Sequence, residues 1–203
     1  MCFTVFGCRV KIRFWFVALI TLSLLIDRTG IAGVGLLATA FHESGHFAAM
    51  ALFHFPPEQV CMSIFGIEIQ EKKGSRRTYG QDAGVALAGP AANLLAFAVC
   101  WGAFLLTSSL YLANLAAANL LLALLNALPV GPLDGGQALY SFLCRSREAE
   151  RSEKIVEVVS FFVILPIAIL GFFILLRSRY NFSLLIVSGY LMLMLLLKKG
   201  RYF

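Results

Sequence analysis

Charged residues are scarce in this sequence: Asp, Glu, Lys and Arg make up 14% of its 203 residues, whereas a soluble domain carries about a quarter. Low-complexity tracts, repeats and long polar stretches are absent as well, which excludes a solenoid, a collagen-like chain and a separate soluble domain. Hydrophobic residues instead make up 60% of the chain. The composition therefore predicts one integral membrane domain over residues 1–203.

The sequence has five cysteines but no C-x-x-C pair. They are scattered through loops and apolar segments, so neither a zinc ribbon nor a disulfide framework is expected. We expect them to be small apolar residues or free thiols that face the cytosol.

Six apolar segments are each near the roughly 20 residues that a helix needs to cross a bilayer. They cover about residues 13–29, 31–54, 83–106, 109–129, 155–176 and 181–197. The expected fold is an all-α polytopic membrane protein with about six transmembrane helices. A signal peptide is the alternative for the first segment, but no clear small-x-small cleavage site follows and another apolar segment begins at once, so we expect an anchor.

Basic residues are distributed unevenly between alternate loops. All but three of the 17 Lys and Arg residues lie at the termini or after the second and fourth apolar segments. The exceptions are Arg28, Arg177 and Arg179. The positive-inside rule therefore predicts that both termini are cytosolic. Topology and anionic lipid account for the net charge of +6, and no motif indicates nucleic-acid binding.

The sequence His-Glu-Ser-Gly-His at positions 42–46 lies inside the second apolar segment. His42 and His46 are four residues apart and so share one face of a helix. This spacing allows two imidazoles to bind one Zn²⁺, with Glu43 beside them as a base for a water molecule. The alternative is that these residues only pair with a neighbouring helix. Placing one ionisable side chain in the middle of a membrane costs on the order of 2.5–3.5 kcal/mol. Because this segment holds three such side chains within five positions, we expect them to have a function.

A catalytic zinc site normally has three protein ligands. His54 lies about 12 Å from His46 along the helix, too far to share a metal. The outstanding candidate is Asp134, because prolines and glycines break the helix in residues 126–136. An ordinary aspartate at a helix end or turn is the alternative. The predicted topology places Asp134 at a depth compatible with His42 and His46, on the cytosolic side, which favours the metal ligand.

Three motifs, in order along the chain, resemble those of the site-2 proteases, a family of intramembrane zinc metalloproteases. They are His42-Glu43-x-x-His46, Gly89-Pro90-x-x-Asn93, and Asn126-x-x-Pro129 followed by Leu133-Asp134-Gly135. They cover a catalytic core of about residues 10–140, with additional transmembrane helices at about 155–197. The compact layout, without an inserted PDZ domain, is similar to the sporulation type that processes a pro-sigma factor. Members of that type commonly carry a C-terminal CBS domain, for which this chain has no room.

The resemblance implies a role for each motif residue. Three side chains would hold Zn²⁺: His42, His46 and Asp134. Glu43 would move the proton of the attacking water to the leaving amine, and Asn126 would donate a hydrogen bond to the scissile carbonyl or its oxyanion. Asn93 would help to position substrate or stabilise the site, and an interhelical hydrogen bond is the alternative for this residue.

Residues 63–70 partly alternate apolar and polar side chains, as a strand does. Because proteases usually cut extended substrates, we expect a short strand or hairpin on the cytosolic side. Its edge, at Ile67 and Ile69, would pair with the unwound backbone of the substrate. A membrane-skimming loop without substrate contact is the alternative.

The sequence thus predicts a zinc metalloendopeptidase that cuts in or near a transmembrane or membrane-associated segment of a regulatory protein. Its expected partners are the lipid bilayer, this substrate and inhibitory membrane proteins, but no nucleic acid. A divalent-metal transporter is one alternative, in which the same four ionisable residues would form a transit site: His42, Glu43, His46 and Asp134. An inactive protease-like scaffold is the other, and the intact Glu43 and ligand set argue against it.

Overall fold

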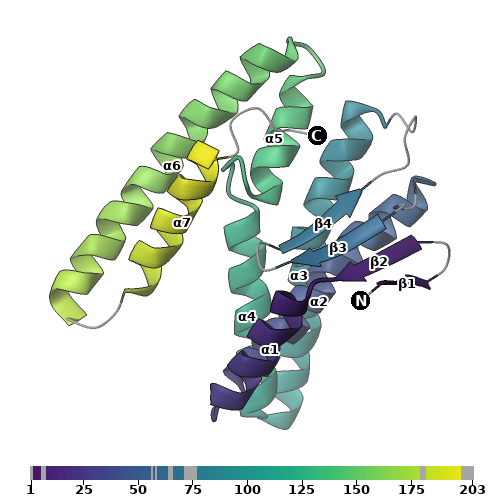
Figure 1. Cartoon of the computed structure of the whole chain (residues 1–203). Coiled ribbons are helices and arrows are strands. Elements are labelled where there is room, and N and C mark those ends of the chain that lie inside the picture. Colours follow the sequence, from purple (N-terminus) through teal and green to yellow (C-terminus); the bar gives the residue numbers. More distant parts are fainter. Residues whose placement is uncertain are drawn as a thin grey trace. The chain divides into compact units, whose positions relative to one another are not determined.

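The computed structural model describes residues 2–5, 8–55, 57, 59–63, 66–70, 77–178 and 182–197. Within these ranges lie seven helices: α1 Phe14–Ile26, α2 Ile31–Leu52, α3 Tyr79–Thr107, α4 Leu110–Asn126, α5 Asp134–Leu143, α6 Ala149–Ser178 and α7 Ser183–Leu197. They also contain four strands: β1 Cys2–Val5, β2 Cys8–Ile12, β3 Gln59–Ser63 and β4 Gly66–Gln70 (Figure 1). The chain divides into two compact units, which we describe separately: unit 1 is Met1–Arg77 with Ala91–Ala123, and unit 2 is Thr78–Pro90 with Leu124–Phe203.

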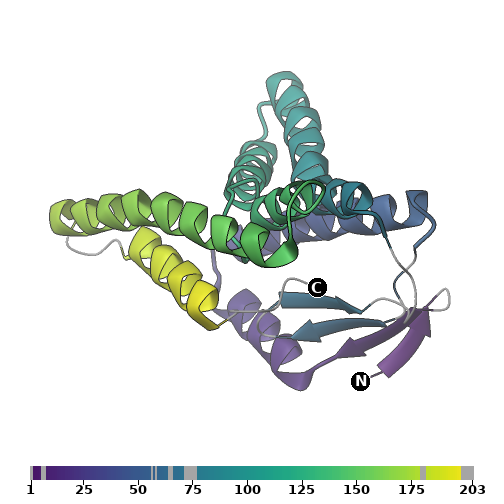
Figure 2. The same cartoon turned by 90° about the horizontal axis from the view of Figure 1, so that it is seen from above.

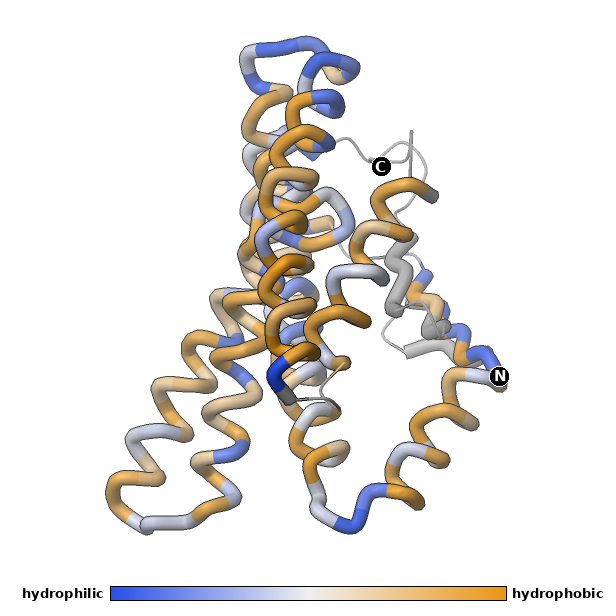
Figure 3. The backbone as a smooth tube through the Cα atoms, turned by 90° about the vertical axis from the view of Figure 1, so that its left-hand side faces the viewer, coloured by the Kyte–Doolittle hydropathy of each residue, from blue (hydrophilic) through white to orange (hydrophobic). Residues whose placement is uncertain are grey.

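The predicted apolar segments correspond to α1, α2, α3, α4, α6 and α7, and hydrophobic residues dominate the helices in Figure 3. Among the described residues, α3 and α6 are long and apolar enough to cross a membrane, whereas α1, α4 and α7 are shorter apolar helices. Six crossings and cytosolic termini remain predictions. Some of the basic residues on which the predicted orientation rests lie outside the described residues, at positions 72–76, 179 and 198–201.

The strands form one sheet in unit 1, in the order β1-β2-β3-β4. β3 and β4 form an antiparallel hairpin after α2, and β2 pairs in parallel with β3. The expectation of an all-α fold with a single short hairpin was therefore incomplete, because β1 and β2 double the number of strands. Residues 64 and 65 of the predicted strand segment lie outside the described residues, and the side of the membrane on which the sheet lies remains a prediction.

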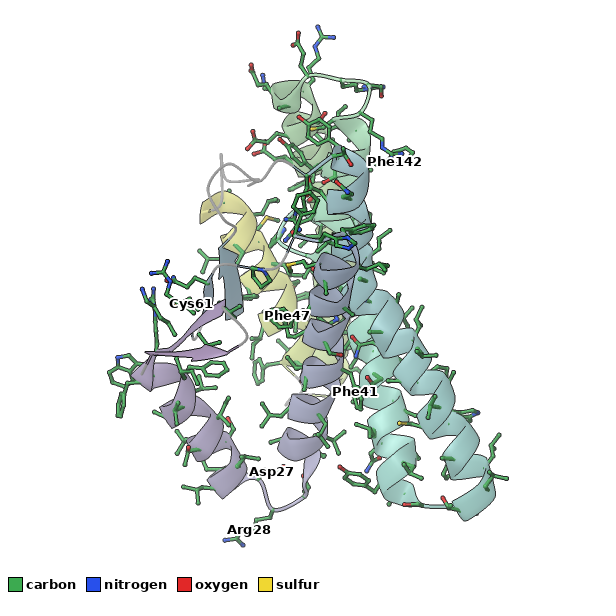
Figure 4. The ribbon with its side chains drawn as sticks, turned by 90° about the vertical axis from the view of Figure 1, so that its right-hand side faces the viewer. Asp27, Arg28, Phe41, Phe47, Cys61 and Phe142 are labelled. Atoms are coloured by element: carbon green, nitrogen blue, oxygen red, sulfur yellow. The ribbon has the colours of Figure 1, made fainter. Side chains whose placement is uncertain are left out.

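The turn before α2 is held by Asp27 (Figure 4). Its carboxylate accepts hydrogen bonds from the Thr29 hydroxyl at 2.6 Å and from the backbone N–H groups of Thr29 at 2.8 Å and Ala32 at 2.6 Å. The hydroxyl bond first, and then the backbone bonds, hold the pKa of Asp27 below its ordinary value. Because Ala32 lies in the first turn of α2, Asp27 satisfies an N–H group that the helix itself cannot.

One face of α2, a helix of unit 1, is buried. Its buried residues recur at every fourth position: Val34, Ala38, His42, His46 and Met50. Val34 packs in an apolar cluster with residues of α3 and α4: Cys100, Leu115 and Ala116. The small, fully buried Ala116 allows helices to approach closely. Both histidines of the motif therefore lie on the face of α2 that packs into the protein.

In unit 2, α6 and α7 lie side by side and antiparallel (Figure 2). Gly171 permits this approach, since a Cβ there would lie 3.0 Å from the backbone nitrogen of Leu185. The apolar cluster between these helices also includes Val130, which is fully buried and belongs to the loop before α5. The helix pair thus anchors the loop that leads to Asp134.

Candidate metal centre

His42 and His46 meet on the buried face of α2. Their side chains are 6% and 8% exposed, and their ring centroids lie 4.8 Å apart with the planes at 81°. The two Nε2 atoms are 3.2 Å apart. Helix geometry accounts for this meeting, because residues four apart are stacked on one face.

The separation of the two Nε2 atoms fits a shared tetrahedral metal. With zinc–nitrogen bonds of about 2.0–2.1 Å, two ligands of a tetrahedral complex lie about 3.3 Å apart. The observed 3.2 Å is close to this value. The histidine pair therefore supplies two converging nitrogen donors at the spacing that zinc requires.

Asn93 of α3 supports His42 from behind. Its Oδ1 atom lies 2.6 Å from Nδ1 of His42, on the opposite side of the ring from Nε2. Its Nδ2 atom donates to the carbonyl of Ala38 at 2.9 Å and to Oδ1 of Asn119 at 2.7 Å. Asn93 is fully buried. These bonds to α2 and α4 are the interhelical hydrogen bonds that the sequence analysis considered for it. A role toward substrate remains a prediction.

Asn119 of α4 is a neighbour of this site that the sequence interpretation missed. It is fully buried, and its Nδ2 atom donates to the carbonyl of Leu115 at 2.8 Å. The signal that was available is the presence of three asparagines in an otherwise apolar helix: Asn114, Asn119 and Asn126. Without the tertiary structure, the sequence did not identify which of them is buried or what it contacts.

Glu43 follows His42 on α2 and is half-buried. Its neighbour Ser44 is exposed, and the Ser44 hydroxyl donates to the carbonyl of Phe41 at 2.6 Å. Ser44 is therefore engaged with its own helix, while Phe41 and Phe47 extend from the same helix in unit 1 (Figure 4). The serine in the middle of the motif leaves its two histidines undisturbed.

Asp134 is the first residue of α5 in unit 2 and is half-buried. α4 ends at Asn126, and residues 127–133 form the irregular connection that the prolines and glycines predicted. The N–H of Gly131 donates to the hydroxyl of Ser160 at 2.8 Å, and this hydroxyl donates to the carbonyl of Val156. The helix dipole places positive charge near Asp134, which favours a carboxylate at this position.

Two glycines allow α5 to begin against its own connecting loop. A Cβ atom at Gly135 would collide with the carbonyl oxygens of Ala127 and Leu128, and one at Gly136 would collide with the backbone of Val130. No rotation of a side chain relieves a collision with backbone. Glycine is thus required at both positions that follow Asp134 at this helix start.

The remaining predicted residues lie in two places. Asn126 is half-buried at the end of α4 in unit 2. Ile67 and Ile69 belong to β4, whose strand partner among the described residues is β3. His54 lies beyond the end of α2 with a positive φ of 63°, consistent with the interpretation of this residue as a helix-end residue.

Comparisons with known proteins found two similarities. Residues 106–170 match the model of peptidase family M50, a stretch that contains Asn126 and Asp134 and begins after the histidine motif. The site-2 protease from Methanocaldococcus jannaschii has a similar structure, with a TM-score of 0.69 and 18% sequence identity over 99% of this chain and 95% of that one. No curated protein sequence matches.

These findings confirm the predicted resemblance to the site-2 proteases. They also support a metalloprotease as the class of protein and a membrane as its location. The substrate and the identity of the metal stay predictions.

Proposed function

We propose that this chain is an intramembrane zinc metalloprotease that hydrolyses a peptide bond in or beside a membrane segment of another protein. The observation that carries the proposal is the pair of buried histidines with Nε2 atoms 3.2 Å apart. The peptidase family match and the site-2 protease fold support it.

The proposed ligands are His42, His46 and Asp134, a set of side chains that could hold a metal ion. Two imidazoles and one carboxylate are a usual set of ligands for catalytic zinc and leave one position open. When bound, zinc would lower the pKa of a water molecule and polarise the scissile carbonyl. These donors favour zinc over calcium or magnesium, which prefer oxygen ligands.

Two further side chains act on the reacting groups in this proposal. Glu43 accepts a proton from the attacking water and transfers it to the leaving amine. Asn126 donates a hydrogen bond from its amide to the scissile carbonyl oxygen, where negative charge develops.

The edge of β4 is the proposed binding site for the substrate backbone. In the hairpin register, Ser63 pairs with Gly66, and only two residues separate them. In the usual two-residue hairpin, the closing pair is of the hydrogen-bonded kind. Because pairs alternate along an antiparallel ladder, Ile67 and Ile69 form the other kind of pair. Their backbone N–H and C=O groups therefore point away from β3, toward the side on which a substrate strand can add.

The proposed location is the membrane, with several crossings and both termini in the cytosol, as the distribution of basic residues indicates. We propose a membrane-tethered or membrane-associated regulatory protein as the substrate, with a pro-sigma factor as the class that the motif layout indicates. Membrane proteins that cover the edge of β4 are the proposed inhibitors.

The deciding experiment is co-expression of the chain with candidate membrane-tethered transcription regulators, followed by repetition with purified proteins in detergent. A defined fragment that disappears on removal of zinc and returns on its addition is the expected result. Metal flux into reconstituted vesicles without proteolysis of any candidate would instead establish the transporter. Tight substrate binding with neither activity would establish the scaffold.

A further inference from the structure

Two buried asparagines connect His42 to α4 within unit 1. The chain of side-chain hydrogen bonds runs from His42 to Asn93 and from Asn93 to Asn119. All three residues are buried, and both asparagines are fully excluded from solvent. Buried amides must satisfy their donors and acceptors inside the protein, so the direction of each bond in the chain has consequences for the next.

The backbone fixes the direction of every bond in this chain. A carbonyl oxygen can only accept, so the nitrogen of Asn119 must face Leu115 and the nitrogen of Asn93 must face Ala38. The oxygen of Asn119 then accepts from Asn93. The oxygen of Asn93 is left to face Nδ1 of His42 at 2.6 Å.

An oxygen acceptor at this distance requires a proton on Nδ1 of His42. In a neutral imidazole, the other nitrogen then carries a lone pair. That nitrogen, Nε2, is the atom that faces His46 at 3.2 Å. The two asparagines thus select the tautomer whose lone pair is directed to the proposed metal position, and they orient the ring.

We infer that Asn93 and Asn119 are positioning residues that hold His42 in its metal-binding tautomer, with Asn119 acting only through Asn93. The inference rests on the proposed zinc site and deepens it. Groups behind a metal-ligating histidine change metal affinity by about 10–100-fold when they are removed.

Zinc affinity of the metal-stripped, full-length protein in detergent tests this order of action. Asn93→Leu should weaken zinc binding by about 10–100-fold, and Asn119→Leu by about tenfold or less. The double variant should bind no more weakly than Asn93→Leu alone, because Asn119 has no effect once its partner is lost. If the two substitutions acted independently, their fold-losses of zinc affinity would instead multiply in the double variant.

Two variants control for general effects of substitution. Asn119→Asp keeps an oxygen that accepts from Asn93 and should restore most of the lost affinity, which a simple packing defect would not allow. Asn114→Leu makes the same chemical change at an exposed position of the same helix and should bind zinc like the wild type. Cobalt absorption should report a tetrahedral site in the wild type and a weakened one in Asn93→Leu.

A second test uses nitrogen NMR of the wild-type protein with labelled histidines. This test does not depend on whether the Leu variants fold. The expected spectrum shows His42 protonated at Nδ1, and His54→Gln assists assignment without touching the site. A proton on Nε2 of His42, or equal zinc affinity in all variants, would overturn the inference. If the wild type bound no zinc, the proposed function would fail, while the tautomer would still be read from the metal-free protein.

Discussion

The Nε2 atoms of His42 and His46 lie 3.2 Å apart on the buried face of α2. Without a metal, two neutral imidazoles at this distance can share one N–H···N hydrogen bond, whereas a cation between them would bind a lone pair of each ring. The next residue after His42 is Glu43, which a helix places about 100° around the axis from its neighbour. The two proposed metal ligands and the proposed proton acceptor therefore lie on different faces of α2. Their separate roles can be tested by substituting each residue in turn.

Glu43→Gln should abolish cleavage while leaving about one zinc bound per chain. The amide keeps the shape of the side chain but cannot take a proton, and loss of a general base costs at least about 100-fold in rate. His46→Ala and Asp134→Ala should reduce both cleavage and zinc content, because each removes a proposed ligand. Metal analysis of the purified variants beside a fragment assay measures both effects. Normal cleavage by Glu43→Gln would eliminate the base assignment.

The histidine motif was predictable because it depends only on residues close together in the sequence. A period of 3.6 residues places His42 and His46 together whatever surrounds the helix. Fold features that depend on distant segments were not predictable in this way. β2 pairs with β3 in parallel across two intervening helices, and its short, partly basic sequence resembles a flank of the first apolar segment.

The helix α5 was missed for a different reason. It has ten residues and begins directly after a run of prolines and glycines, which reads as a turn. Its helical start depends on the absence of two Cβ atoms against the loop backbone, a tertiary requirement. Likewise, Asn119 lies in an apolar helix whose sequence does not reveal which face meets α3.

Gly136→Ala should displace Asp134 and lower zinc affinity. The added Cβ would collide with the backbone of Val130, and relief requires movement of the start of α5. Overpacking of this kind typically costs about 1–3 kcal/mol of stability. Zinc titration and thermal unfolding in detergent measure the two effects.

Gly102→Ala is the matched control for this substitution. Nothing lies within 4 Å of a Cβ at Gly102, which is inside α3. Alanine should therefore stabilise the helix by about 0.5–1 kcal/mol and leave zinc affinity unchanged. Unchanged zinc affinity in Gly136→Ala as well would show that the start of α5 does not position a ligand.

Asp27→Ala should loosen the start of α2 at neutral pH. The pKa of Asp27 is lowered in the folded protein by its bonds to Thr29 and Ala32. Its stabilising contribution is therefore complete above the ordinary value of 3.8 and is lost as the pH falls through the lower folded value. The unfolding temperatures of wild type and variant should differ at pH 7 and converge in strong acid. Thr29→Val, which keeps the backbone bonds, should show a smaller difference; a constant difference at all pH values would contradict the role of the charge.

The last prediction concerns the edge of β4, where proline separates substrate pairing from sheet formation. Proline removes a backbone N–H and is tolerated on an edge strand where that N–H faces outward. Ile67→Pro should therefore keep the sheet and reduce kcat/KM by about 3–10-fold, the value of one lost hydrogen bond, and Ile69→Pro should act alike. Ile67→Val keeps the N–H and should be mild. Glu68→Pro removes an N–H that faces β3 and should destabilise the hairpin itself.

Crosslinks from cysteines at alternating positions of residues 66–70 to the cleavage region of the substrate measure proximity directly. If both isoleucine positions accept proline without loss of activity and no crosslink forms, the segment is a membrane-skimming loop and substrate binds elsewhere.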